Sequence, residues 1–111
     1  MGYDIYIVRK GETEEEFNER DDCDEGEYFR ANLAAMPVLL DAMEEAGVFP
    51  QVDPGLFMYM QGDLVTAQES EFIGKSLAAA PPPGDPRVAK FVDEFRRFCE
   101  RAAAEGGFRL C

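Results

Sequence analysis

Apolar residues recur at helical spacing in three segments of the chain. The clearest segment is 86–105, where valine, phenylalanine, cysteine and alanine fall at i, i+3, i+4, i+7 and onward. Asp85 offers an N-cap carboxylate, and Pro86 suits the first helical turn because it loses no hydrogen bond there. Gly106 and Gly107 end the pattern. We therefore predict a long helix whose apolar stripe is the largest contribution to the core.

Two shorter helices are predicted at 37–46 and 67–79. The first ends at Gly47, which is followed by an apolar residue, as in the common glycine-terminated helix end. The second follows Thr66, with Glu69 three residues later, a pair that forms a capping box. Both segments carry apolar residues three and four positions apart, so each has one face for a core.

Period-two and continuous apolar runs predict a small sheet of about four short strands, near 3–8, 27–31, 56–61 and 107–110. The first run is apolar on both faces, which is typical of an interior strand. The run after Gly55 is short and bounded by turn residues, which favours a buried strand. Residues 1–111 are thus expected to form a single α+β domain, with the sheet packed by three helices.

Acidity is concentrated in residues 12–27, where ten carboxylates face one arginine and give −9 of the net −12. Thr13 and Glu16 form a second capping-box pattern, which predicts a short helix over about 14–20 with Phe17 as its single apolar anchor. Like charges along such a helix repel, and one anchor buries little surface. We therefore expect this segment to be mobile.

The rest of the composition limits the classes of function that the protein can have. A net charge of −12 disfavours nucleic-acid and anionic-membrane binding, and no apolar run is long enough to span a bilayer. The chain has no histidine and no phosphate-binding, dinucleotide-binding or nucleophile motif, so we predict no metal, no cofactor and no assignable catalytic residue. The odd set Cys23, Cys99 and Cys111 is typical of reduced thiols in a cytoplasmic protein.

Two groups of residues are candidate sites. The first is a small polar pocket at the end of the predicted strand near 27–31, which carries Tyr28 and Phe29. Its residues are Asp4, Tyr6, Arg30 and Asn32. In that case the chain would be a small enzyme or a ligand-binding domain. The structural alternative is that the asparagine stabilises a bend and the arginine pairs with a nearby carboxylate.

The second candidate is the acidic segment itself. Clustered carboxylates accelerate association with a cationic surface, which favours a protein-binding module over an enzyme. The most concrete version is an inhibitor, immunity or anti-defence protein whose acidic segment takes the place of nucleic-acid phosphates. The alternatives are a solvated, solubilising loop and an oligomeric accessory subunit. The candidate partner-binding residues are Glu14, Glu15, Glu16, Glu19, Asp21, Asp22, Asp24 and Glu25.

Four short stretches resemble a group of small bacterial proteins of actinobacterial type. They are the initial MGYDIYIVR, the YFRAN of 28–32, the GDLVT of 62–66 and the GGF of 106–108. The chain departs from the group after Asn32, where Leu-Ala-Ala replaces aromatic and glycine residues. The resemblance implies a single α+β domain and supplies no functional residues.

Overall fold

The computed structural model describes residues 2–58 and 63–110 and confirms the α+β class. Its strands form one antiparallel sheet in the order β2-β1-β4-β3. They are β1 Gly2–Ile7, β2 Tyr28–Asn32, β3 Leu64–Val65 and β4 Phe108–Leu110. The predicted interior position of the first strand is confirmed, because β1 pairs with β2 on one side and with β4 on the other.

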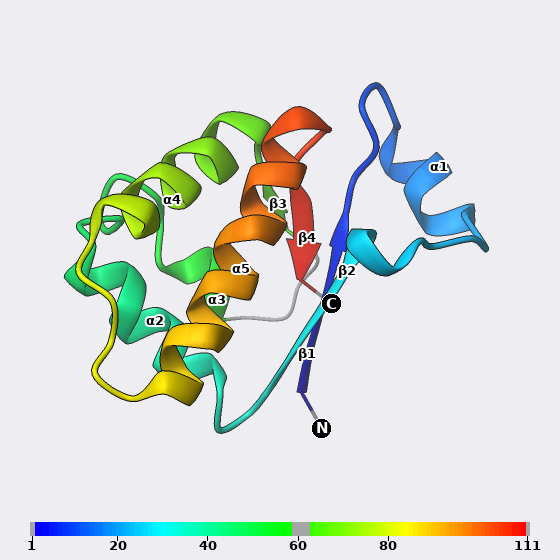
Figure 1. Ribbon diagram of the computed structural model, residues 1–111. Helices are drawn as coiled ribbons and strands as arrows, with labels where there is room; N and C mark the ends of the chain where they lie inside the picture. The colour runs from blue at the N-terminus through cyan, green and yellow to red at the C-terminus, as the bar shows by residue number, and fades with distance from the viewer. Residues whose placement is uncertain (1, 59–62, 111) are drawn as a thin grey trace.

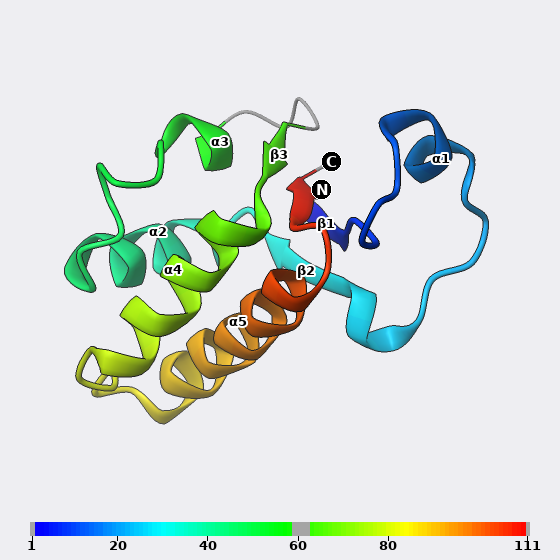
Figure 2. The same cartoon turned by 90° about the horizontal axis from the view of Figure 1, so that it is seen from above.

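The described residues contain five α-helices rather than the three predicted. The predicted helices are α2 (Met36–Glu45), α4 (Ala67–Ala79) and α5 (Pro86–Ala104). They cover one face of the sheet (Figures 1 and 2). The other face carries α1 (Glu14–Glu19), which is followed by the 3-10 turn η1 (Glu25–Glu27). The fifth helix is the single turn α3 (Gly55–Met58).

The predicted helix ends are confirmed at atomic level. Thr66 caps α4 by accepting a hydrogen bond from the Glu69 N–H at 3.1 Å, and Asp85 caps α5 through the Arg87 N–H at 2.9 Å. At the end of α2, Gly47 adopts a φ of +81°. The N–H groups of Gly47 and Val48 then bond back into the last turn, so glycine ends the helix as expected.

The prediction of a buried strand at 56–61 is wrong for its described part. Residues 56–58 lie in α3, whereas 59–61 lie outside the described residues. Asp53 explains the difference, because its carboxylate accepts the Gly55 N–H at 2.9 Å and its carbonyl accepts the Leu56 N–H at 3.1 Å. These bonds start a helical turn. The third strand along the chain is instead β3, which pairs with β4 at the end of the sheet.

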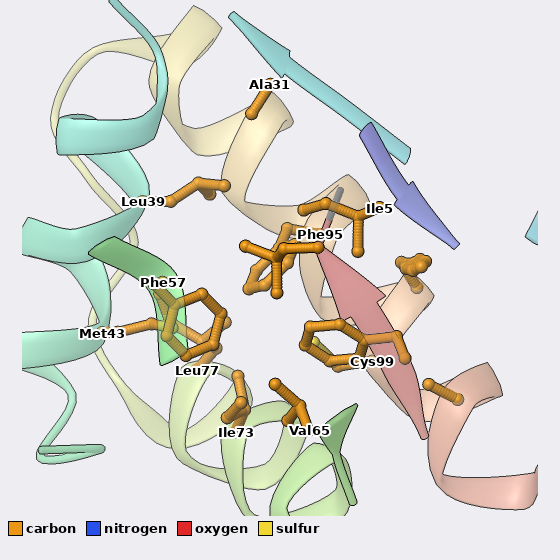
Figure 3. Packing of buried hydrophobic residues seen from close by; sticks show 14 of the residues in the cluster. Ile5, Ala31, Leu39, Met43, Phe57, Val65, Ile73, Leu77, Phe95 and Cys99 are labelled. Atoms are coloured by element: carbon orange, nitrogen blue, oxygen red, sulfur yellow. The ribbon is translucent and has the colours of Figure 1, made fainter. Parts of the chain in front are cut away.

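The core lies between the sheet and the three covering helices (Figure 3). Helix α5 supplies its apolar stripe, with Val92, Phe95, Phe98, Cys99 and Ala102 all buried. Phe108 on β4 packs its ring 6.3 Å from that of Phe95. Gly107 allows β4 to follow directly, because a Cβ there would lie 2.1 Å from the Val65 carbonyl oxygen. The long C-terminal helix thus fixes the inner side of the sheet.

Candidate functional site

The face of the sheet turned away from α2, α4 and α5 is polar, and we call it the outer sheet face. Strand alternation places it opposite the buried Ile5 and Ile7. The pairing of β2, β1 and β4 places one row of side chains across this face, in which Tyr6 lies opposite Tyr28 on one side and Arg109 on the other. A second row pairs Asp4 with Arg30. The outer sheet face therefore carries aromatic rings and charges side by side.

Residues 12–27, which we call the acidic arm, lie against one part of this face (Figure 2). The predicted capping box starts α1, because Thr13 accepts the Glu16 N–H and Glu16 accepts the Thr13 N–H, both at 3.1 Å. Phe17 is the apolar anchor, as predicted: its ring centroid lies 6.5 Å from that of Tyr6 in an edge-on arrangement. The arm is thus attached to β1 by an aromatic contact.

Arginine side chains reinforce that attachment. The guanidinium carbons of Arg20 and Arg109 lie 5.4 Å and 5.8 Å from the centroid of the Phe17 ring. Cations over an aromatic face are attracted by its quadrupole. Arg20 also donates to the Ile7 carbonyl at 2.8 Å, and its side chain is only 7% exposed. The arm's single arginine therefore points into the molecule, leaving the arm's outer surface without a cation of its own.

Arg20 belongs to an ion cluster under the arm. Its guanidinium lies 3.6 Å from the Glu12 carboxylate and 3.5 Å from that of Glu27. Arg9, just beyond β1, donates to Glu27 at 2.9 Å and to Asp22 at 2.8 Å. Because the Glu27 side chain is only 4% exposed, its charge requires these partners. The cluster ties both ends of the arm to the same place on the sheet.

The cluster also sets the protonation of its carboxyl groups. Hydrogen bonds from Arg9 lower the pKa of Glu27 to about 2, against the opposing effect of burial. The same guanidinium lowers the pKa of Asp22. A hydrogen bond to an ionised carboxylate favours the charged form. Both groups therefore stay ionised at neutral pH and hold the arm in place.

Ion pairs neutralise only part of the arm. Of its ten carboxylates, the three on Glu12, Asp22 and Glu27 pair with Arg9 or Arg20. The other seven form no ion pair within the described chain, and all of them are exposed. They lie on α1, on the loop that follows it and at the start of η1. These seven are Glu14, Glu15, Glu16, Glu19, Asp21, Asp24 and Glu25.

The structure places three of the four predicted pocket residues together. Asp4 accepts hydrogen bonds from Arg30 at 3.0 Å and from the Tyr28 hydroxyl at 2.5 Å. The bond to Asp4 raises the pKa of Tyr28. The Tyr6 ring lies 5.1 Å from that of Tyr28. Asn32 has a structural role instead, because its side-chain oxygen accepts the Ala35 N–H at 2.7 Å and so stabilises the turn after β2.

Sequence reasoning missed the residues that organise the arm, Arg9 and Arg20 above all. Their signal was present, because one arginine precedes the acidic run and the other interrupts it. Their pairing with Glu27, 18 and 7 positions away along the chain, depends on the tertiary fold. Tyr28 was likewise not among the predicted site residues. Its position opposite Tyr6 follows from the register of β1 and β2.

The surroundings of the two described thiols disfavour the thiolate form. Cys99 is buried in the core, and desolvation raises its pKa. Cys23 is exposed and free, and desolvation together with the Glu27 charge raises its pKa as well. A thiol is reactive as its thiolate, so both shifts oppose reactivity. Cys111 lies outside the described residues.

A cleft of about 620 Å³ lies between α2, the α4–α5 connector and α5. Its lining includes Leu77, Val92 and three consecutive prolines, with Asp93 and Arg96 among the polar residues. Arg96 is already bonded to Asp93 at 2.7 Å. The cleft therefore presents mainly small apolar surface, and the Asp93 and Arg96 side chains at its wall are paired with each other.

Within the described chain, none of the helices has both the length and the apolar character to cross a bilayer. The resemblance to small bacterial proteins rests on the four short stretches alone. Neither a protein-family model, nor a curated protein, nor a solved structure matches this chain.

Proposed function

We propose that this protein is a protein-binding module that docks its acidic arm on a basic surface of another protein. The observation that carries the proposal is the set of seven exposed, unpaired carboxylates on an arm anchored by Phe17 and by the ion cluster. A focused negative field raises the rate of encounter with a cationic partner. Anchoring reduces the conformational entropy lost on binding.

The most concrete form of this module is an inhibitor, immunity or anti-defence protein. Basic surfaces that bind nucleic acid, such as the cleft of an RNA-cleaving toxin or the groove of a DNA-binding protein, are matched to phosphate spacing and charge. A row of carboxylates on α1 and its following loop offers the same sign of charge at close intervals. In this role the acidic arm competes with the nucleic acid.

The test is affinity capture from the native host with matched variants. One variant carries Glu14→Gln, Glu15→Gln, Glu16→Gln and Glu19→Gln. Glutamine at position 16 can retain the capping box, so the arm's helix should persist. The control variant removes four exposed carboxylates elsewhere, through Asp41→Asn, Glu44→Gln, Glu45→Gln and Glu94→Gln.

We expect the wild-type protein and the control variant to capture the same basic protein, and the arm variant to lose it. Capture by all three proteins in equal amounts would contradict a docking role for the arm. Equal loss from both variants would show that total charge acts, and would contradict the proposal in the same way. Circular dichroism of each variant establishes that the fold is retained.

A further inference from the structure

Strand β2 lies at one end of the sheet, and within the described chain β1 is its only strand neighbour. An edge strand leaves every second set of backbone N–H and C=O groups without a ladder partner. The exposed residues Tyr28, Arg30 and Asn32 alternate along β2. Within the described chain, the second edge of β2 is therefore not paired with a strand.

Proteins usually protect such edges with proline, bulges or charges. The β2 sequence YFRAN contains neither proline nor glycine, and it pairs with β1 in continuous register over five residues. Its one charged residue is Arg30, whose guanidinium lies 3.0 Å from the Asp4 carboxylate on β1. That pair neutralises the charge that would otherwise repel an approaching copy.

Exposed apolar surface gathers at both ends of the same strand. Leu33 is 52% exposed just after β2, and Tyr28 is 36% exposed at its start. They are two of the three large apolar or aromatic side chains that stand exposed in the described chain. On the inner side, the half-buried rings of Phe29 and Phe91 lie tilted by 32° with centroids 5.4 Å apart. A neighbouring strand would add contacts to the exposed side chains at the ends of β2.

We propose that β2 pairs antiparallel with β2 of a second copy of this chain, joining two four-stranded sheets into one. An antiparallel pair of identical strands is self-complementary about a two-fold axis. The inner faces of the two sheets lie on the same side when Arg30 of one copy is opposite Arg30 of the other. In this register, each Tyr28 lies opposite Asn32 of the other copy and near its Leu33. Each Arg30 remains paired with its own Asp4.

Charge permits this arrangement although each copy carries −12. The acidic arm precedes β2, so antiparallel pairing sends the two arms to opposite ends of the paired strands. Five residues span about 17 Å at ~3.3 Å each. This exceeds the Debye length of ~8 Å at physiological ionic strength, so the two arms are largely screened from one another.

The first test is the molar mass of the native protein by sedimentation equilibrium, from micromolar to millimolar concentration. We expect a concentration-dependent rise toward twice 12.4 kDa, and a larger dimer fraction at higher salt because repulsion between equal charges is screened. This salt dependence is opposite to that of the arm's binding to a basic partner, so failure of either proposal is distinguishable from failure of the other. A monomer over the whole range would overturn the pairing.

The second test places the interface by oxidative crosslinking in a C23S/C111S background. The variant R30C puts a thiol at the centre of the proposed pair, and K75C puts one on the exposed face of α4. We expect R30C to form a disulfide-linked dimer at least tenfold faster than K75C. Equal rates for the two variants, or a faster rate for K75C, would overturn the proposed interface.

Discussion

Helices α5 and α1 lie on opposite faces of the same sheet and are held there by different forces. Both begin at a side-chain cap, on Asp85 and Thr13. Helix α5 has 19 residues and buries five of them, whereas α1 has six residues and buries none. Helix α5 is held by apolar burial, whereas α1 is held by the contacts of the Phe17 ring and by the neighbouring ion cluster. The protein thus separates its folding surface from its charged, exposed surface.

The largest loss of stability is expected from a substitution in the core, on the inner side of the sheet. Phe95→Ala removes a fully buried ring between Phe29 and Phe108 and should lower the free energy of unfolding by about 3–5 kcal/mol. Urea denaturation measures this loss. The matched substitution Phe17→Ala, at the half-buried anchor of α1, should cost less. Equal losses would show that the two faces do not differ as described.

The second largest loss of stability is expected from a substitution in the ion cluster. Arg20→Met retains much of the side-chain volume but leaves Glu27 and the Ile7 carbonyl without one donor each. We expect a loss of about 1–3 kcal/mol in the free energy of unfolding, the usual cost of an unsatisfied buried polar group. The control is Arg97→Met on α5, an exposed residue paired with Asp93, which should change the value by less than about 0.5 kcal/mol. A change at Arg20 no larger than this control would contradict a structural role for the cluster.

These contrasts explain what the sequence could predict. Helix termini are local, so the Thr66 and Thr13 capping boxes and the glycine at 47 were readable from a few residues. The turn at Asp53 carries the same Asp-Pro signal as the start of α5, but the apolar residues after it matched a strand equally well. Partners across the sheet, such as Arg9 with Glu27, depend on tertiary structure and were not readable.

A smaller effect is expected on how the free energy of unfolding depends on pH. The pKa of Glu27 falls from an ordinary value near 4.5 to about 2, so its ionised form stabilises the folded protein above pH 4.5. That contribution is lost as the pH falls through about 2, where the folded-state carboxylate is protonated. Wild type should therefore exceed Glu27→Gln in unfolding free energy at pH 7, and the difference should shrink between pH 4.5 and pH 2. Urea titrations across this range measure it, and a difference independent of pH would contradict the ion pairing.

The central claim is that the exposed carboxylates of the acidic arm drive docking on a basic partner. Its most direct test is the association rate with the captured partner, measured by stopped flow at rising salt. The four-glutamine arm variant should associate more slowly than both wild type and the four-site control at 0.1 M salt, where the Debye length is ~10 Å. The difference should vanish near 1 M salt, where that length is ~3 Å. An association rate that changes with neither the substitutions nor the salt would contradict the claim.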